Sequence, residues 1–162
     1  MGQALAIRRA TPQDEPALGR LGALLVRVHH DFDAARFIPP GPGTERGYGR
    51  FLAGETGRDD ALVLVAEVDG AVAGYVYAVN EGADWMSLRG PAGVIYDIAV
   101  DPDHRRAGVG RRLVEAALDA LTGLGAKQVV LSSATPNKAA QTLFAKAGFR
   151  PTMVEMTRDL PG

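Results

Sequence analysis

Apolar residues along this chain fall into runs of strand length and into stripes of helical spacing. The clearest stripe is Leu18, Leu21, Leu25 and Val28, whose spacings of three and four residues place them on one helical face. The segment Thr11-Pro-Gln-Asp14 supplies an N-cap and an early proline, so a helix is expected to begin there. The whole pattern predicts strands over residues 4–9, 61–68, 71–80, 94–100, 128–133 and 150–158, and further helices over 45–53, from Gly110 to a C-cap at Gly125, and over 139–147.

The connections between these elements predict a mixed α/β (α+β) domain. Asp69-Gly70 separates two strand patterns and is a strong hairpin signal, so that pair is expected to be antiparallel. The strand, helix and strand from Val94 to Ser133 are expected to form a right-handed parallel crossover. We therefore expect a mostly antiparallel central sheet with one parallel pair at its middle and helices on both faces.

Residues 29–43 break the helical pattern with His-His-Asp-Phe-Asp and then Phe-Ile-Pro-Pro-Gly-Pro-Gly. A long irregular connection inside a compact domain commonly covers a binding site. This segment is therefore a candidate substrate lid. The histidines at its start have a simpler interpretation, because a cation at a helix C-terminus favours the helix dipole.

Length and composition narrow the class of protein. A chain of 162 residues is expected to form a single domain over residues 1–162. The formal net charge of -1 indicates neither a nucleic acid nor an anionic membrane as partner. The chain has no cysteine, and neither a secretory signal nor a run long enough to span a membrane is evident, so a cytoplasmic protein is expected. Because carboxylates and histidines do not cluster at ligand spacing, no metal site is expected.

A cationic, glycine-containing loop follows the strand at 94–100 and opens a helix. In Arg105-Arg-Ala-Gly108-Val-Gly110-Arg111, the glycines permit close approach of an anion, and the arginines offer forked donors. A helix N-terminus adds unpaired N–H groups and a partial positive charge. The dinucleotide pattern Gly-x-Gly-x-x-Gly fails at Leu113, and the chain contains no Gly-Lys-Ser or Gly-Lys-Thr of a P-loop. A different phosphate-bearing ligand is therefore indicated.

The loop after Ile98-Ala-Val100-Asp-Pro resembles the acetyl-CoA-binding motif Arg/Gln-x-x-Gly-x-Gly/Ala of the GNAT superfamily of N-acetyltransferases. Asn137 and the segment from Leu143 to Phe149 resemble the next motif of that superfamily, at the expected distance. The resemblance covers residues 61–158 well and the first 60 residues in element order. It implies a GNAT-like fold in which the strands at 94–100 and 128–133 splay apart to admit acetyl-CoA.

The resemblance also implies roles for individual residues. The backbone of residues 98–100 would pair with the pantetheine arm, the loop 105–111 would hold the pyrophosphate, Asn137 would contact the pantetheine region and Phe144 would line the thioester end. A backbone N–H near Val100 would stabilise the oxyanion. The implied acetyl-CoA site comprises Ile98, Ala99, Val100, Arg105, Arg106, Ala107, Gly108, Val109, Gly110, Arg111, Asn137 and Phe144.

Acetyl transfer to an amine requires a base for the ammonium proton and, usually, an acid for the thiolate. Asp97 is the candidate general base, although a strand carboxylate can equally bond a neighbouring hydroxyl or arginine. Members of the family often carry a tyrosine where this chain has Phe144, which donates no proton. Tyr96 is a candidate acid; Tyr75, Tyr77 or a water could substitute, or the thiolate could leave unassisted.

The sequence thus indicates an N-acetyltransferase that moves acetyl from acetyl-CoA to a primary amine by direct attack in a ternary complex, since no cysteine can carry the acetyl group. The acceptor is a small amine, an aminoglycoside or a peptide amine. The acids at 31, 33, 81 and 84 favour a cationic one. The alternative is a CoA-binding sensor or regulatory module with weakened catalysis, and a homodimer is a further expectation from the family.

Overall fold

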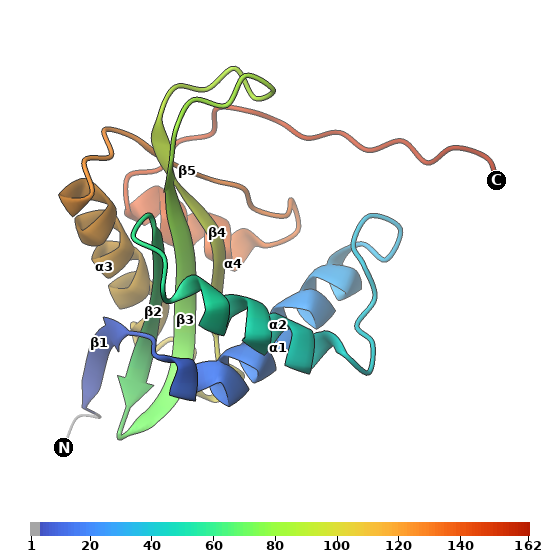
Figure 1. Cartoon of the computed structure of the whole chain (residues 1–162). Helices are drawn as coiled ribbons and strands as arrows, with labels where there is room; N and C mark the ends of the chain where they lie inside the picture. The colour runs from blue at the N-terminus through green and yellow to red at the C-terminus, as the bar shows by residue number, and fades with distance from the viewer. Residues whose placement is uncertain (1–3) are drawn as a thin grey trace.

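The computed structural model describes residues 4–162, which fold around one five-stranded sheet (Figure 1). The strand order is β1-β2-β3-β4-β5, so each strand lies beside its neighbour in sequence. The strands are β1 (Leu5–Arg9), β2 (Ala61–Val68), β3 (Ala71–Glu81), β4 (Ala92–Val100) and β5 (Val129–Leu131). The mixed α/β architecture expected from the sequence is confirmed.

The first four strands are antiparallel, and β4 and β5 are parallel. The hairpin predicted between β2 and β3 is present, with Asp69 at φ 49° and Gly70 at φ 85°. Two successive positive φ values are what a type I′ turn requires, which explains the Asp-Gly pair.

Helices cover both faces of the sheet. α1 and α2 pack on one face, with Leu18, Leu21 and Leu52 fully buried. α3 packs on the other face through Val109, Leu113, Ala117 and Leu121, which recur at helical spacing. The helices are α1 (Glu15–Phe32), α2 (Thr44–Glu55), α3 (Val109–Gly123) and α4 (Lys138–Lys146), with short 3-10 turns at Pro12–Asp14 and Pro102–His104.

Glycines allow α1 and α2 to cross in close contact. A Cβ added at Gly19 would lie 2.4 Å from the Glu45 carbonyl oxygen, and one at Gly49 would lie 2.6 Å from the Glu15 carbonyl oxygen. A Cβ at Gly22 would lie 2.2 Å from the ring of Tyr48. Small residues at this crossing therefore let the Tyr48 ring lie directly against α1, which decides where its hydroxyl reaches.

The largest departure from expectation is at the C-terminal end. The strand predicted over residues 150–158 is wrong: this segment is extended but pairs with no strand of residues 4–162. A strand-forming sequence needs a partner to become a strand, and Pro151 removes one backbone donor. Without a sixth strand, the parallel pair lies at the edge of the sheet instead of its middle.

Two smaller differences concern element lengths. The strand expected over residues 128–133 is limited to Val129–Leu131, because pairing with β4 stops at Leu131. The helical pattern was expected to break at His29, yet α1 continues to Phe32. Within residues 4–162, no helix is long and apolar enough to cross a membrane.

Candidate active site

A cleft opens where β5 leaves β4. The parallel pairing runs from Gly93 with Val129 to Ile95 with Leu131 and then stops. Beyond Ile95, the backbone of β4 faces no strand of residues 4–162 on that side, so its N–H and C=O groups can pair with another partner. The cleft has a volume of about 290 Å³ and is lined by both strands, by α1, and by α4. The separation of the two strands that the family resemblance implies is therefore present in the fold.

The N-terminus of α3 lies near the end of β4. Gly108 is the N-cap, at φ +77°, a left-handed conformation that favours glycine. Among the residues that the structure describes, no side chain caps this helix start, so its first N–H groups can bind an anion. A Cβ at Gly108 would meet nothing within 4 Å, so its conformation, and not crowding by the protein, requires glycine.

At position 110, glycine is favoured for a different reason, which is close packing. A Cβ there would lie 3.2 Å from Leu143 of α4 and 3.8 Å from Val100 of β4. The glycine therefore lets the start of α3 pack between β4 and α4. This packing places the cationic loop at the end of β4 that leads into the cleft.

The arginines of the loop are exposed, as an anion site at the surface requires. Arg111 is already paired with Glu115 of the same helix, at 2.7 Å. Arg106 adopts φ 65°, which is uncommon for a non-glycine residue. Arg105 and Arg106 have no ion-pair partner within residues 4–162, so they are the free cations of this loop.

Three of the cofactor residues proposed from the sequence line the cleft: Ile98, Asn137 and Phe144. Asn137 is the N-cap of α4, and its side-chain oxygen accepts a hydrogen bond from the Ala140 N–H at 3.2 Å. Asn137 therefore has a structural role as the cap of α4 in addition to lining the cleft. Phe144 is buried and packs edge-on against Phe149.

A β-bulge decides where Asp97 lies. Tyr77 of β3 pairs with Asp97 and Ala78 pairs with Ile95, so Tyr96 is the extra residue on β4. Strict alternation would put Ile95 and Asp97 on one face of the sheet. The bulge leaves Ile95 in the core under α3 and turns Asp97 to the opposite face, toward α1 and α2.

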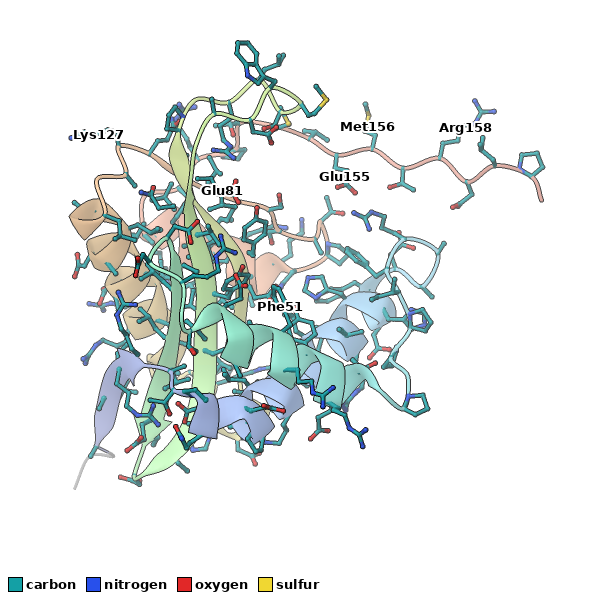
Figure 2. All side chains as sticks on the ribbon, in the orientation of Figure 1. Phe51, Glu81, Lys127, Glu155, Met156 and Arg158 are labelled. Atoms are coloured by element: carbon teal, nitrogen blue, oxygen red, sulfur yellow. The ribbon has the colours of Figure 1, made fainter. Side chains whose placement is uncertain are left out.

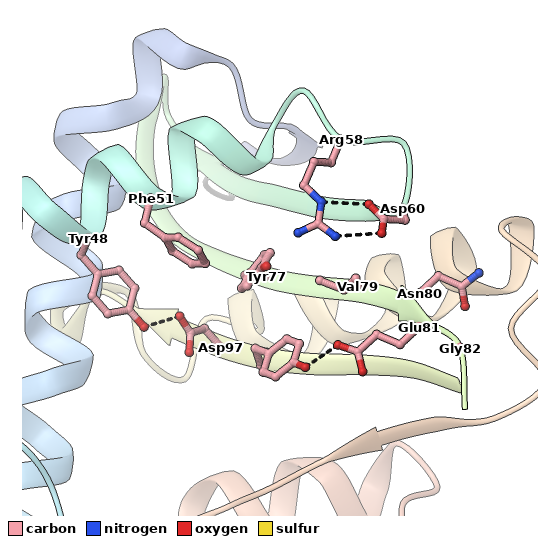
Figure 3. A pocket seen from close by; sticks show the side chains of 11 residues that line it. Tyr48, Phe51, Arg58, Asp60, Tyr77, Val79, Asn80, Glu81, Gly82 and Asp97 are labelled. Carbon is pink, nitrogen blue, oxygen red and sulfur yellow. Dashed lines mark hydrogen bonds and ion pairs between the residues drawn. The ribbon is translucent and has the colours of Figure 1, made fainter. Parts of the chain in front are cut away.

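Asp97 is held there by two tyrosines, of which Figure 3 shows Tyr48. The hydroxyls of Tyr48 on α2 and Tyr75 on β3 both donate to Oδ2 of Asp97, the latter at 3.1 Å. Burial raises the pKa of Asp97, and the two hydroxyl donors and nearby His29 oppose that rise. Because both tyrosines bond the same oxygen, Oδ1 is left for another partner.

A second pocket, of about 570 Å³, adjoins the cleft on the side of α2 and is rich in aromatic and acidic residues. The ring of Tyr77 stacks with Tyr96 at 5.8 Å and meets Phe51 edge-on at 5.5 Å. The Tyr77 hydroxyl donates to Glu55 at 2.6 Å. The cleft and this pocket share Tyr48, Tyr96 and Asp97, so the two cavities are adjacent.

Tyr96 stands at the boundary between the two cavities and is half exposed. Its hydroxyl donates to Glu81, which also pairs with Arg89 at 2.9 Å. The hydrogen bond to Glu81 raises the pKa of Tyr96, so the phenol stays protonated at neutral pH. Tyr77 and Tyr75 also have raised pKa values, chiefly because they are buried.

Sequence reasoning missed two residues of the site, Tyr48 and His29. Tyr48 reaches Asp97 from α2, and His29 lines the cleft from α1, with its Nδ1 2.9 Å from the Leu25 carbonyl oxygen. The spacing of Gly19 and Gly22 was a usable signal for a close helix crossing at Tyr48. No local pattern pointed to His29, because its place depends on how α1 crosses the sheet.

The segment 29–43 forms part of the wall of the cleft. Phe37 and Ile38 line the cleft, and Phe37 packs edge-on against His29 at 5.1 Å. Its movement as a lid stays a prediction. The expected absence of a metal also stays a prediction, and within residues 4–162 no three His, Asp or Glu side chains are grouped to hold one.

Comparisons with known proteins agree with this geometry. A mycothiol acetyltransferase from Thermobispora bispora is 37% identical over 102 residues, covering 60% of this chain and 33% of that protein. The chain thus spans about a third of the length of this relative. A mutant of the BH1408 protein from Bacillus halodurans has the same fold, with a TM-score of 0.79 at 20% identity over 96% of this chain and 99% of the other.

An aminoglycoside N-acetyltransferase solved in complex with CoA shares the fold at a TM-score of 0.69 and 18% identity, covering 99% of this chain and 97% of that one. The sequence profile of the acetyltransferase (GNAT) family matches residues 26–149, which include α2, the bulged strand, the cationic loop and α4. The chain belongs to the acetyltransferase (GNAT) family.

Proposed function

We propose that this domain transfers an acetyl group from acetyl-CoA to a cationic primary amine by direct attack in a ternary complex. The observation that carries the proposal is that two cavities of different character lie side by side and share Asp97 in their lining. A cleft with an unpaired strand edge meets an acidic, aromatic pocket, and Asp97 lies at their junction. An acyl donor and an amine can therefore meet beside a carboxylate.

The residues present fit CoA. The unpaired backbone of β4 from Tyr96 to Val100 suits an extended amide-bearing arm, which would bind as an added strand. The uncapped start of α3, with Arg105 and Arg106 beside it, suits the pyrophosphate. When bound, acetyl-CoA supplies the activated acetyl thioester. The chain has no cysteine to carry the acetyl group, which supports direct attack.

Asp97 is the proposed base. Its Oδ2 is held by Tyr48 and Tyr75, which fixes the carboxylate of a residue that lines both cavities. Burial raises the pKa of Asp97, which makes the carboxylate a better proton acceptor than an exposed one. It would accept the ammonium proton directly or through a water.

Tyr96 is the proposed source of a proton for the thiolate, because its phenol borders the cleft; its raised pKa makes it a weaker acid and opposes this role. Its hydroxyl donates to Glu81, so this role requires the phenol to turn from Glu81 toward the cleft. Phe144, at the position where the family often has a tyrosine, has no proton to give. A thiol is also a good enough leaving group to depart without help.

The lining of the larger pocket supports a cationic acceptor. Asp60, Glu81 and Asp97 line it, while its one arginine, Arg58, is already paired with Asp60 at 2.8 Å and with Glu55 at 2.7 Å. The aromatic rings add faces on which a cation or a sugar ring can pack. Relatives named for mycothiol and for aminoglycosides make amine-bearing sugars the first acceptors to test.

The test combines binding and turnover. Purified protein is titrated with CoA in a thermal-shift assay and then incubated with radiolabelled acetyl-CoA and an amine library. We expect CoA to raise the melting temperature and a cationic amine to become labelled. CoA binding without turnover on any amine would favour the alternative, a CoA-binding sensor or regulatory module. No effect of millimolar CoA on melting would overturn the proposal.

A further inference from the structure

The cleft contains a protonatable side chain besides Asp97 and the tyrosines. His29, in the last turn of α1, lines the cleft together with Asp97 and Phe144. Its Nδ1 lies 2.9 Å from the carbonyl oxygen of Leu25. A carbonyl oxygen only accepts hydrogen bonds, so Nδ1 carries a hydrogen. Nε2 is therefore the ring nitrogen that can gain or lose a proton.

The imidazole ring of His29 is held in one orientation. It packs edge-on against Phe32, with ring centroids 5.8 Å apart, and against Phe37 at 5.1 Å. The hydrogen bond to Leu25 fixes the rotation of the ring within this packing. Within residues 4–162, no group forms a hydrogen bond with Nε2. Nε2 is thus left for a ligand of the cleft.

A positive charge on His29 is compensated from two sides. The ring lies at the C-terminal end of α1, where the helix dipole stabilises a cation. Asp97 of β4 is close enough for the two charges to interact, and His29 lowers the pKa of that carboxyl. The acidic residues that follow on the same segment, Asp31 and Asp33, are exposed to solvent. Asp97 is therefore the partly buried carboxylate that an imidazolium here would face.

The other titratable groups near the ring are neutral or paired. Burial raises the pKa of Tyr48, and the hydrogen bond to Glu81 raises that of Tyr96, so both phenols of the cleft are uncharged at neutral pH. Arg36 is paired at 2.6 Å with Glu155, which lies on the extended C-terminal segment (Figure 2). These groups therefore add no uncompensated charge beside the imidazole.

An imidazolium suits the protonation of a thiolate better than Tyr96 does. A phenol ordinarily has a pKa of about 10 and an imidazolium one of about 6.5, so the imidazolium is the stronger acid. The Tyr96 hydroxyl must also leave Glu81 before it can act. His29 can give up the proton on Nε2 without breaking a hydrogen bond of residues 4–162.

We propose that the His29 imidazolium protonates the departing thiolate, and that Tyr96 is not required for this step. As the amine nitrogen bonds to the carbonyl carbon and the C–S bond breaks, the sulfur keeps the bonding electron pair and receives the proton of His29 Nε2. The neutral imidazole then accepts the proton that the nitrogen loses as the amide forms. Asp97 takes the earlier ammonium proton and releases it to solvent. This inference rests on the proposed function.

The thiol of bound CoA reports on His29 without any acetyl transfer, because a neighbouring cation lowers the pKa of a thiol. The ultraviolet absorbance of the CoA thiolate is followed against pH in complexes with the wild type, His29→Gln and His30→Gln. His30 is the matched control, since its Nδ1 lies 3.0 Å from the Phe37 carbonyl oxygen and it is not among the residues that line the cleft. We expect the thiolate to form about one pH unit higher in His29→Gln than in the other two complexes. Equal titrations in all three would overturn the proposal.

The leaving group of the donor separates proton donation from a structural role. Thiophenolate needs less protonation than the thiolate of CoA, so S-acetyl thiophenol is compared with acetyl-CoA. His29→Gln should lower kcat/KM by about 100-fold or more with acetyl-CoA and by about tenfold or less with S-acetyl thiophenol. Equal losses with both donors would overturn the proposal. The same donor dependence in Tyr96→Phe, with none in His29→Gln, would assign the step to Tyr96 instead.

A second variant guards against misfolding. His29→Asn retains an amide donor for the Leu25 carbonyl and should reproduce both effects of His29→Gln. CoA should raise the melting temperature of each variant as it does that of the wild type. If CoA leaves the melting temperature of the wild type unchanged, the proposed function fails and this inference fails with it. A normal rise combined with equal thiolate titrations overturns the role of His29 alone.

Discussion

The two halves of the site are built in different ways. The groups proposed to hold the cofactor come from one stretch of sequence, β4 to α4, in which strand, glycine loop, helix N-terminus and Asn137 follow in order. The acceptor half comes from side chains on α2, β3 and β4 that are far apart in sequence, such as Tyr48, Tyr77 and Tyr96. Backbone geometry makes the first half, and tertiary packing makes the second.

This difference explains why the two halves respond to different kinds of substitution. A strand edge and a helix N-terminus present main-chain groups, so a change of backbone conformation should damage the cofactor half. The acceptor half depends on where side chains point, so a change of helix packing or of one hydrogen bond should damage it. Measurements of CoA binding and of amine turnover on single variants therefore separate the two halves.

The largest effect is expected for Asp97→Asn. Loss of the base should lower kcat/KM for the amine by about 10²- to 10⁴-fold at neutral pH, with the CoA dissociation constant unchanged. Asn still accepts a hydrogen bond from Tyr48 or Tyr75, so the fold should persist. Steady-state kinetics and calorimetry measure the two effects. Asp60→Asn, which lines the same pocket but not the cleft, is the matched control and should show a much smaller decrease in kcat/KM.

The same variant has a predictable pH dependence of stability. Because burial raises the pKa of Asp97, the folded protein binds this proton more tightly than the unfolded chain does. The stability that this carboxyl contributes is therefore present below its ordinary pKa and is lost as pH rises through its folded pKa. Melting temperatures are measured for both proteins across the acidic range. The melting temperature of Asp97→Asn should rise relative to that of the wild type as pH rises. A difference between the two that does not change with pH would contradict the raised pKa.

Gly22→Ala should come next. Its Cβ would lie 2.2 Å from the Tyr48 ring, and overpacking of this kind costs about 1–3 kcal/mol. The displaced Tyr48 should reduce amine turnover and leave CoA affinity unchanged. Gly47→Ala is the matched control, because a Cβ there meets nothing within 4 Å. Replacing this helical glycine by alanine should raise the free energy of unfolding by about 0.5–1 kcal/mol. Urea unfolding compares the two, and equal stabilities would mean that the α1–α2 crossing tolerates a methyl group.

Gly108→Ala should affect the cofactor half alone. At φ +77° an alanine costs about 1–2 kcal/mol, and its methyl group would stand where a phosphate approaches the start of α3. We expect CoA to bind about tenfold more weakly, which corresponds to about 1.4 kcal/mol. Gly125→Ala, at φ +89° beyond the other end of α3, carries the same strain and should bind CoA normally. A loss of affinity shared by both variants would mean that strain, and not the cradle, is responsible.

Tyr48→Phe should have the smallest effect and a specific sign. Its hydroxyl lowers the pKa of Asp97, so removing it should raise that pKa further. The acidic limb of kcat/KM against pH should therefore move to higher pH, with about 1 kcal/mol lost from the hydrogen bond. Tyr77→Phe loses a similar bond, to Glu55, and should leave the limb in place. An unshifted limb in Tyr48→Phe would remove Tyr48 from a positioning role.

Most of the fold was predictable from local pattern. The Asp69-Gly70 turn, which leaves two residues between β2 and β3, follows from what those residues permit locally. The end of α4 before Gly148, which adopts φ +93°, follows in the same way. The segment 150–158 has an equally strand-like pattern and forms no strand. A local sequence pattern indicates which secondary structure a segment can form. Whether it becomes a strand depends on whether the edge of another strand is close enough to pair with it.

The sequence by itself predicted the proposed cofactor half, because a glycine loop between a strand and a helix has few possible geometries and its spacing is local. The tertiary structure decided the acceptor half. The bulge at Tyr96 turned Asp97 to the face of α1 and α2, and the glycine crossing of α1 and α2 brought Tyr48 to it. Neither event is visible in local periodicity, since a one-residue bulge reverses the side of every following side chain and a helix crossing depends on contacts between distant segments.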